Sequence, residues 1–147
     1  MRNSEVVSPV PAIGAAITAP QTRLAARSHL WLNRLLIGGI AIQFYTVALA
    51  ALGISGFAAH ALLGWSMIAV AVASAAAAGV SRMPLAALAL PLLALALTVA
   101  QPVLAAIPRS VFPVMYALHG ANAVFVLLLA LRVEKRARAH SRKLSNS

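Results

Sequence analysis

The sequence is most informative in what it lacks. It has no cysteine and only two acidic residues, Glu5 and Glu134, in a chain of 147. Without cysteine the chain has no disulfide, no thiolate metal ligand, no covalently attached c-type haem and no cysteine nucleophile. A soluble domain carries far more charge on its surface than this chain provides, so the composition excludes that class.

Groups that could catalyse a reaction are also scarce. No Asp, Glu or Lys lies within the long apolar runs, which leaves a carboxylate proton relay or a retinal-type Schiff base without a residue. The sequence also lacks a Gly-x-Ser-x-Gly elbow and a glycine-rich phosphate-binding loop. We therefore expect no enzymatic site unless a bound cofactor supplies the chemistry.

Apolar residues make up 62% of the chain and fall into four long segments, roughly 31–53, 57–80, 84–106 and 111–133. Each segment has about 22 residues, enough for a helix to cross about 30 Å of hydrocarbon. Pro91 and Pro102 predict a bend or a loosened turn in the third segment. The predicted fold is all-α, a four-helix transmembrane bundle over residues 29–133, with a disordered tail at 1–28 and a basic tail at 134–147.

Basic residues give a formal charge of +10 and indicate how the chain is oriented. They gather in the two tails and the central loop, whereas the first and third loops hold only Arg109 between them. The positive-inside rule then places both termini in the cytoplasm, here of a bacterium with the bundle in its inner membrane. The membrane surface also explains the positive charge better than nucleic acid does.

Two stretches with the same pattern place histidine in apolar surroundings, FAAHALLGW around His60 and YALHGANAV around His119. Gln43 precedes His60 by 17 residues and Gln101 precedes His119 by 18. Two hairpin repeats of nearly 59 residues predict an approximate two-fold axis along the membrane normal. The predicted orientation places both histidines in the outer leaflet, and such an axis places them across a shared central space.

Two facing imidazoles are the ligands that a six-coordinate haem iron requires. Gly64, one turn beyond His60, would leave room for a flat macrocycle. Arg109 is either a partner for a haem propionate or an interfacial anchor.

Three amide side chains have two open interpretations: Gln43, Gln101 and Asn122. They either join helices by hydrogen bonds or orient the ligating imidazoles. His29 and His140 lie in the flanks and are expected to be solvated.

The segments Gln101-Pro-Val-Leu-Ala-Ala and Leu118-His119-Gly-Ala-Asn carry a family resemblance. Over residues 35–133 the chain resembles one four-helix half of a haem A synthase, and also short four-span bacterial membrane proteins of unknown function. The resemblance implies that His60 and His119 are axial haem ligands. Catalysis does not carry over, because the synthase joins two such halves. A second histidine pair, which a transmembrane two-haem carrier needs, is missing.

Two functions therefore stand as alternatives. The first is an integral membrane protein that binds b-type haem through His60 and His119, for electron transfer or haem handling near the outer leaflet. Its expected partners are the lipid bilayer and a membrane redox complex or quinone, and not nucleic acid. The second is a cofactor-free accessory or assembly subunit of a membrane complex, in which the histidines are polar packing groups.

Overall fold

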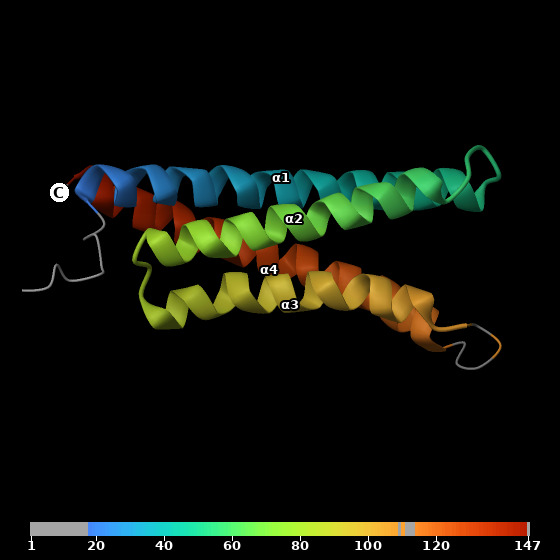
Figure 1. The fold of residues 1–147 in the computed structure, drawn as a ribbon. Helices are drawn as coiled ribbons and strands as arrows, with labels where there is room; N and C mark the ends of the chain where they lie inside the picture. Colours follow the sequence, from blue (N-terminus) through green and yellow to red (C-terminus); the bar gives the residue numbers. More distant parts are fainter. Residues whose placement is uncertain (1–17, 109, 111–113, 147) are drawn as a thin grey trace, which may run out of the picture.

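The computed structural model describes residues 18–108, 110 and 114–146, which form four helices (Figure 1). They are α1 (Ala19–Ala51), α2 (Ala58–Val80), α3 (Leu85–Ala106) and α4 (Val114–Ser145). Within this part of the chain there is no strand. All four helices are long and apolar enough to cross a membrane, as in a multi-pass membrane protein. The predicted all-α class and the number of helices are confirmed.

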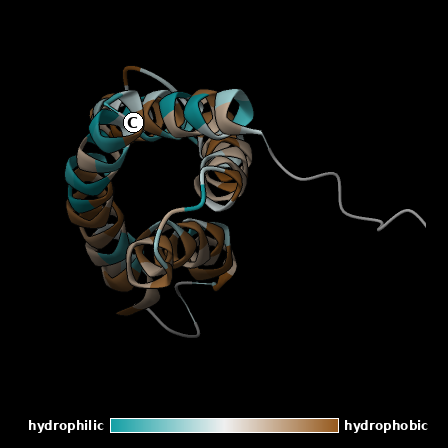
Figure 2. Ribbon diagram, turned by 90° about the vertical axis from the view of Figure 1, so that its left-hand side faces the viewer, coloured by the Kyte–Doolittle hydropathy of each residue, from teal (hydrophilic) through white to brown (hydrophobic). Residues whose placement is uncertain are grey.

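The helices form a ring around a central axis (Figure 2). Each helix packs against its neighbours in the chain and α1 packs against α4, whereas the backbones of the diagonal pairs do not approach one another closely in the described residues. The start of α1, the α2–α3 connection and the end of α4 lie together at what we call the terminal end (Figure 1). The α1–α2 connection, the end of α3 and the start of α4 lie at the opposite, distal end.

The first and last helices, α1 and α4, extend beyond the predicted spans, and α1 begins within the segment that was predicted to be a disordered tail. Residues 19–28 belong to α1, while residues 1–17 lie outside the described part. Thr18 begins the helix, and its N–H donates to Oε1 of Gln21 at 2.9 Å. The predicted basic tail is likewise helical as far as Ser145. Both extensions bury one side, with Ala26 in α1 and Ala137 in α4 almost inaccessible, so packing orders what composition alone marked as tail.

Helix α3 runs without interruption from Leu85 to Ala106 through both prolines. Each proline lacks an N–H and therefore leaves a carbonyl one turn earlier without its helical donor. A helix in a bundle tolerates this loss when neighbouring groups surround it, and Pro91 is indeed buried. No interruption of α3 is needed to bring Gln101 to the centre of the bundle, where it lines a cavity.

The core is built mainly from small residues in the middle and at the terminal end. The central cluster comes from α1, α2 and α4: Leu36, Ile40, Met67, Ala71, Val126 and Ala130. The thioether of Met67 lies directly against Gly39, in the space that a side chain at position 39 would fill. A second cluster of Ala78, Met83 and Ala87 lies by the α2–α3 connection. Small side chains let the helix backbones approach closely, which is the main source of attraction between helices in lipid.

Polar groups tie the helices together toward the terminal end. The side chain of Asn33 donates to the carbonyl of Ala130 at 2.9 Å. The carboxylate of Glu134 accepts from Arg34 at 3.0 Å and from Arg138 at 2.6 Å. These bonds join α1 to α4, and Glu134 also links successive turns of α4.

Two histidines at this end were wrongly expected to be solvated. His29 is 1% exposed, and its Nδ1 lies 2.9 Å from the carbonyl oxygen of Ser74. His140 is partly buried, and its Nε2 donates to the carbonyl of Ser81 at 2.9 Å. Both contacts join helices, because α1 and α4 continue as a packed pair beyond the predicted spans.

Candidate cofactor site

A cavity of about 350 Å³ lies between the four helices toward the distal end. All four helices contribute to its lining, which is mostly apolar and includes many small residues. Its polar groups include one glutamine–histidine pair from each hairpin, Gln43 with His60 and Gln101 with His119, together with Thr98. A concave, mainly apolar space with a few convergent polar groups is typical of a site for a small molecule or cofactor.

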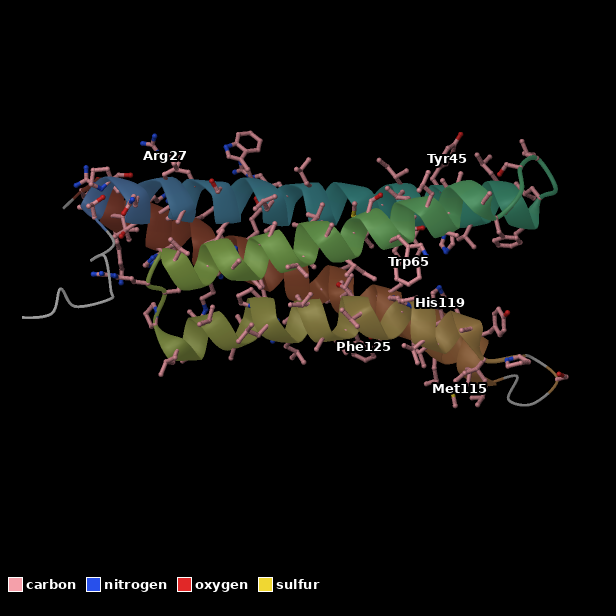
Figure 3. All side chains as sticks on the ribbon, viewed as in Figure 1. Arg27, Tyr45, Trp65, Met115, His119 and Phe125 are labelled. Atoms are coloured by element: carbon pink, nitrogen blue, oxygen red, sulfur yellow. The ribbon has the colours of Figure 1, made fainter. Side chains whose placement is uncertain are left out.

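The two histidines of the predicted pair meet inside this cavity. His60 lies in the first turn of α2 and His119 in the second turn of α4, on helices that face each other diagonally across the ring. Their ring centroids are 6.3 Å apart and the ring planes are inclined by 66°. Figure 3 shows His119 directed toward the space between the hairpins, on the same side as Trp65. The structure thus brings these residues together as the repeat predicted.

Each imidazole is oriented by a backbone carbonyl from the preceding helix of its hairpin. Nδ1 of His119 lies 3.0 Å from the carbonyl oxygen of Gln101, and Nδ1 of His60 lies 3.3 Å from that of Gln43. A carbonyl can only accept, so both bonds require Nδ1 to carry the proton. In a neutral imidazole Nε2 is then left with its lone pair available to a metal.

Side chains add to this support differently in the two hairpins. With its amide nitrogen turned toward the imidazole, Gln101 lies 2.8 Å from His119 Nδ1, and its oxygen accepts from the N–H of Ala123 at 2.8 Å. In this orientation the amide nitrogen also donates to the carbonyl of His119 at 3.1 Å. It can donate to Nδ1 only when Nδ1 carries no proton, so this bond and the bond from Nδ1 to the Gln101 carbonyl belong to different tautomers of the imidazole. On the other side, the hydroxyl of Thr46 lies 3.4 Å from His60 Nδ1.

Gly64 has a more specific role than the one predicted. It lines the cavity, but a Cβ on it would lie only 3.0 Å from Nε2 of Gln43. The missing side chain therefore first makes room for the Gln43 amide. The other amide atom, Oε1, is buried and has no hydrogen-bond partner among the described residues. This acceptor is available to a molecule in the cavity or to water.

The remaining predicted residues lie away from the cavity or outside the described chain. The side chain of Asn122 donates to the carbonyl of Leu97 at 2.8 Å, so it joins α4 to α3. Arg109 lies outside the described residues. Sequence reasoning missed Thr46 and the cavity-lining Thr98 and Trp65. Thr46 and Thr98 stand three residues from Gln43 and Gln101, and this helical spacing was the signal that could have found them. Trp65 comes five residues after His60 and has no such signal.

The donor set limits which metal could bind. No group of three or more His, Cys, Asp or Glu side chains that could hold a metal ion occurs in the described residues. Two imidazoles alone do not complete the coordination of a zinc or copper ion. They suit a metal whose other ligands come from a macrocycle.

Known proteins offer no direct comparison for this arrangement. No protein-family model, no curated protein and no solved structure matches the chain.

Proposed function

We propose that this protein is a membrane protein that binds b-type haem through His60 and His119. The observation that carries the proposal is the separation of the two rings, 6.3 Å between centroids, with both Nδ1 atoms directed at backbone carbonyls. Two imidazoles bound on opposite sides of one metal at about 2 Å each have centroids about 6 Å apart. The observed separation therefore leaves room for one iron between them.

The lining of the cavity supports the same proposal. Its lining is apolar, as a porphyrin face requires, and small residues such as Ala61, Gly64 and Ala123 leave space close to both histidines. His60 and His119 would hold the iron, and the carbonyls of Gln43 and Gln101 would fix the two rings. When bound, haem supplies one-electron chemistry, which suits electron transfer or haem handling.

The matched glutamine–histidine contacts also support an origin in two repeated hairpins. In the first hairpin the carbonyl of Gln43 meets His60, and in the second the carbonyl of Gln101 meets His119. This correspondence is what a two-fold relation between the hairpins would produce, and it agrees with the resemblance to one half of a haem A synthase.

We place the site in the outer leaflet of a bacterial cytoplasmic membrane. All the Lys and Arg residues of the described helices lie in the half of the bundle nearer the terminal end, so the positive-inside rule makes this end cytoplasmic. A redox partner that reaches the haem is then a membrane complex or a quinone, because the cavity lies among membrane-spanning helices.

The optical spectrum of the purified protein tests this proposal. Reduced protein should show the sharp α-band of low-spin, six-coordinate haem, and the haem should be extractable because no cysteine tethers it. His60→Ala and His119→Ala should each abolish the band or convert it to a high-spin form. His140→Ala is the control, because this histidine lies at the other end of the bundle and should leave the band unchanged.

Two results would change the interpretation. If only one variant loses the band, the second ligand is another residue, and Met67, which lines the cavity, is the first to replace. If neither the purified protein nor titration of the protein with hemin gives the band, the function is that of a cofactor-free accessory subunit.

A further inference from the structure

The cavity has one open side, and the exposure of its lining residues locates it. The lining residues of α1 and α4 are all buried or half-buried. The exposed ones belong to the other two helices: Ala61 and Trp65 of α2, Ala105 and Ala106 of α3. The opening therefore lies between α2 and α3, which diverge toward the distal end (Figure 1).

This opening is a lateral slot rather than an axial mouth. Ala106 is the last residue of α3, so the slot begins at the distal end. Trp65 comes seven residues after Ala58, the first of α2, which places it about 10 Å farther along the bundle. Its side chain is 63% exposed although it also lines the cavity, so it stands at the inner edge of the slot (Figure 3). Both walls belong to apolar spanning helices, and the slot therefore faces hydrocarbon.

We infer that the haem enters from the lipid through this slot, with its propionate edge at the distal end and its apolar edge against Trp65. The inference rests on the proposed function and adds the route and the orientation. Carboxylates are costly in hydrocarbon but are tolerated at the interface, where the slot begins. Trp65 offers a large apolar surface at the deep edge. The alanines of the walls leave a flat molecule room to pass.

Linking the two walls tests the route, and the absence of native cysteine makes the chemistry clean. Ala61→Cys and Ala106→Cys are combined, and a bismaleimide joins α2 to α3 across the slot in vesicles. Protein linked before hemin is added should fail to acquire the α-band. Protein loaded first and linked afterwards should keep it, which shows that the link leaves the fold intact. Each single-cysteine variant treated with the same reagent measures how much the added bulk alone slows loading, and the linked protein should load far more slowly than either.

The outcomes separate this inference from the proposed function. If unlinked protein loads and linked protein loads at the same rate, the haem does not use the slot and the inference is wrong. If unlinked protein never binds hemin, the proposed function fails and this inference fails with it.

The orientation has its own test. Trp65→Ala should lose haem about tenfold faster than the wild type through lost contact, whereas Trp65→Phe should retain it. Trp31→Ala, a tryptophan substitution near the terminal end, serves as the control. Equal retention by Trp65→Ala and the wild type would contradict the placement of the apolar edge.

Discussion

Gly64 and Gly120 provide a matched pair of substitutions beside the two histidines. A Cβ at position 64 would lie 3.0 Å from Nε2 of Gln43, whereas a Cβ at position 120 has no neighbouring heavy atom within 4 Å. Replacing glycine by alanine inside a helix stabilises it by about 0.5–1 kcal/mol. At Gly120 this gain should appear in full. At Gly64 the Gln43 side chain must move, and an off-rotamer side chain costs about 0.5–1.5 kcal/mol. The two effects at Gly64 should nearly cancel.

The two positions should also differ in how their substitution affects haem binding. Because the Gln43 amide borders the cavity, Gly64→Ala should weaken haem binding with little change in the free energy of unfolding. Gly64→Leu should abolish binding by filling the space. Gly120→Ala should bind haem normally. Hemin titration followed by absorbance measures the affinity, and unfolding in SDS measures stability. Normal haem affinity in both Gly64 variants would refute the idea that this space belongs to the site.

Three further predictions concern the rest of the molecule. Asn33→Ala should lower the free energy of unfolding by about 0.6–2 kcal/mol through loss of its bond to α4, measured by unfolding in SDS; a larger loss would mean that the bond is worth more than such bonds usually are in lipid. Glu134→Gln should cost less than about 1 kcal/mol at low salt, and the difference should disappear at high salt as the pairs with Arg34 and Arg138 are screened. Reporter fusions at the C-terminus should be active only in the cytoplasm and insertions near Arg109 only outside, and the reverse pattern would invert the proposed orientation.

The spans were predictable because hydrocarbon permits few alternatives to long apolar helices. Their ends were not, since the extensions of α1 and α4 owe their order to one another. Composition marked residues 19–28 as tail, although Ala25 and Ala26 there are buried. The pairing of His60 with His119 was predictable because each histidine follows a glutamine at nearly the same spacing in the sequence, whereas the hydrogen bond from Asn122 to Leu97 depends on which face of α4 meets α3.

A signal for the inward faces is nevertheless present in the sequence. Inward residues in every helix follow alternating steps of four and three. The stripe of α1 is Thr22, Ala26, His29, Asn33, Leu36, Ile40 and Gln43. That of α2 is His60, Gly64, Met67, Ala71, Ser74 and Ala78, and the same steps reach Ser81, which caps the helix. The same steps link Ala87 to Gln101 in α3 and His119 to His140 in α4. Such a heptad spacing is typical of left-handed helix packing. Had it been applied, it would have shown His29 and His140 to be interior residues.

The hydrogen bonds between the two hairpins explain why the cavity lies at the distal end. The bonds that cross between the hairpins, from Asn33 to Ala130 and from His140 to Ser81, lie toward the terminal end. The short α2–α3 connection joins the hairpins at that end too. At the distal end, the histidine bonds to Gln43 and Gln101 each stay within one hairpin. The hairpins are thus held together at one end and diverge at the other.

A haem held by one histidine from each hairpin would supply the missing distal link. Binding should therefore stabilise the protein, by about 2.7 kcal/mol at a free hemin concentration a hundred times Kd. Hemin should also protect backbone amides from hydrogen exchange only near the site. In hydrogen exchange, hemin should slow exchange around His60 and His119 and leave the region around His29 and Ser74, already tied together, almost unchanged. The control is His119→Ala, in which hemin should have no effect at either end. Equal protection along the whole bundle, or protection that persists in this variant, would show that the cofactor does not join the hairpins.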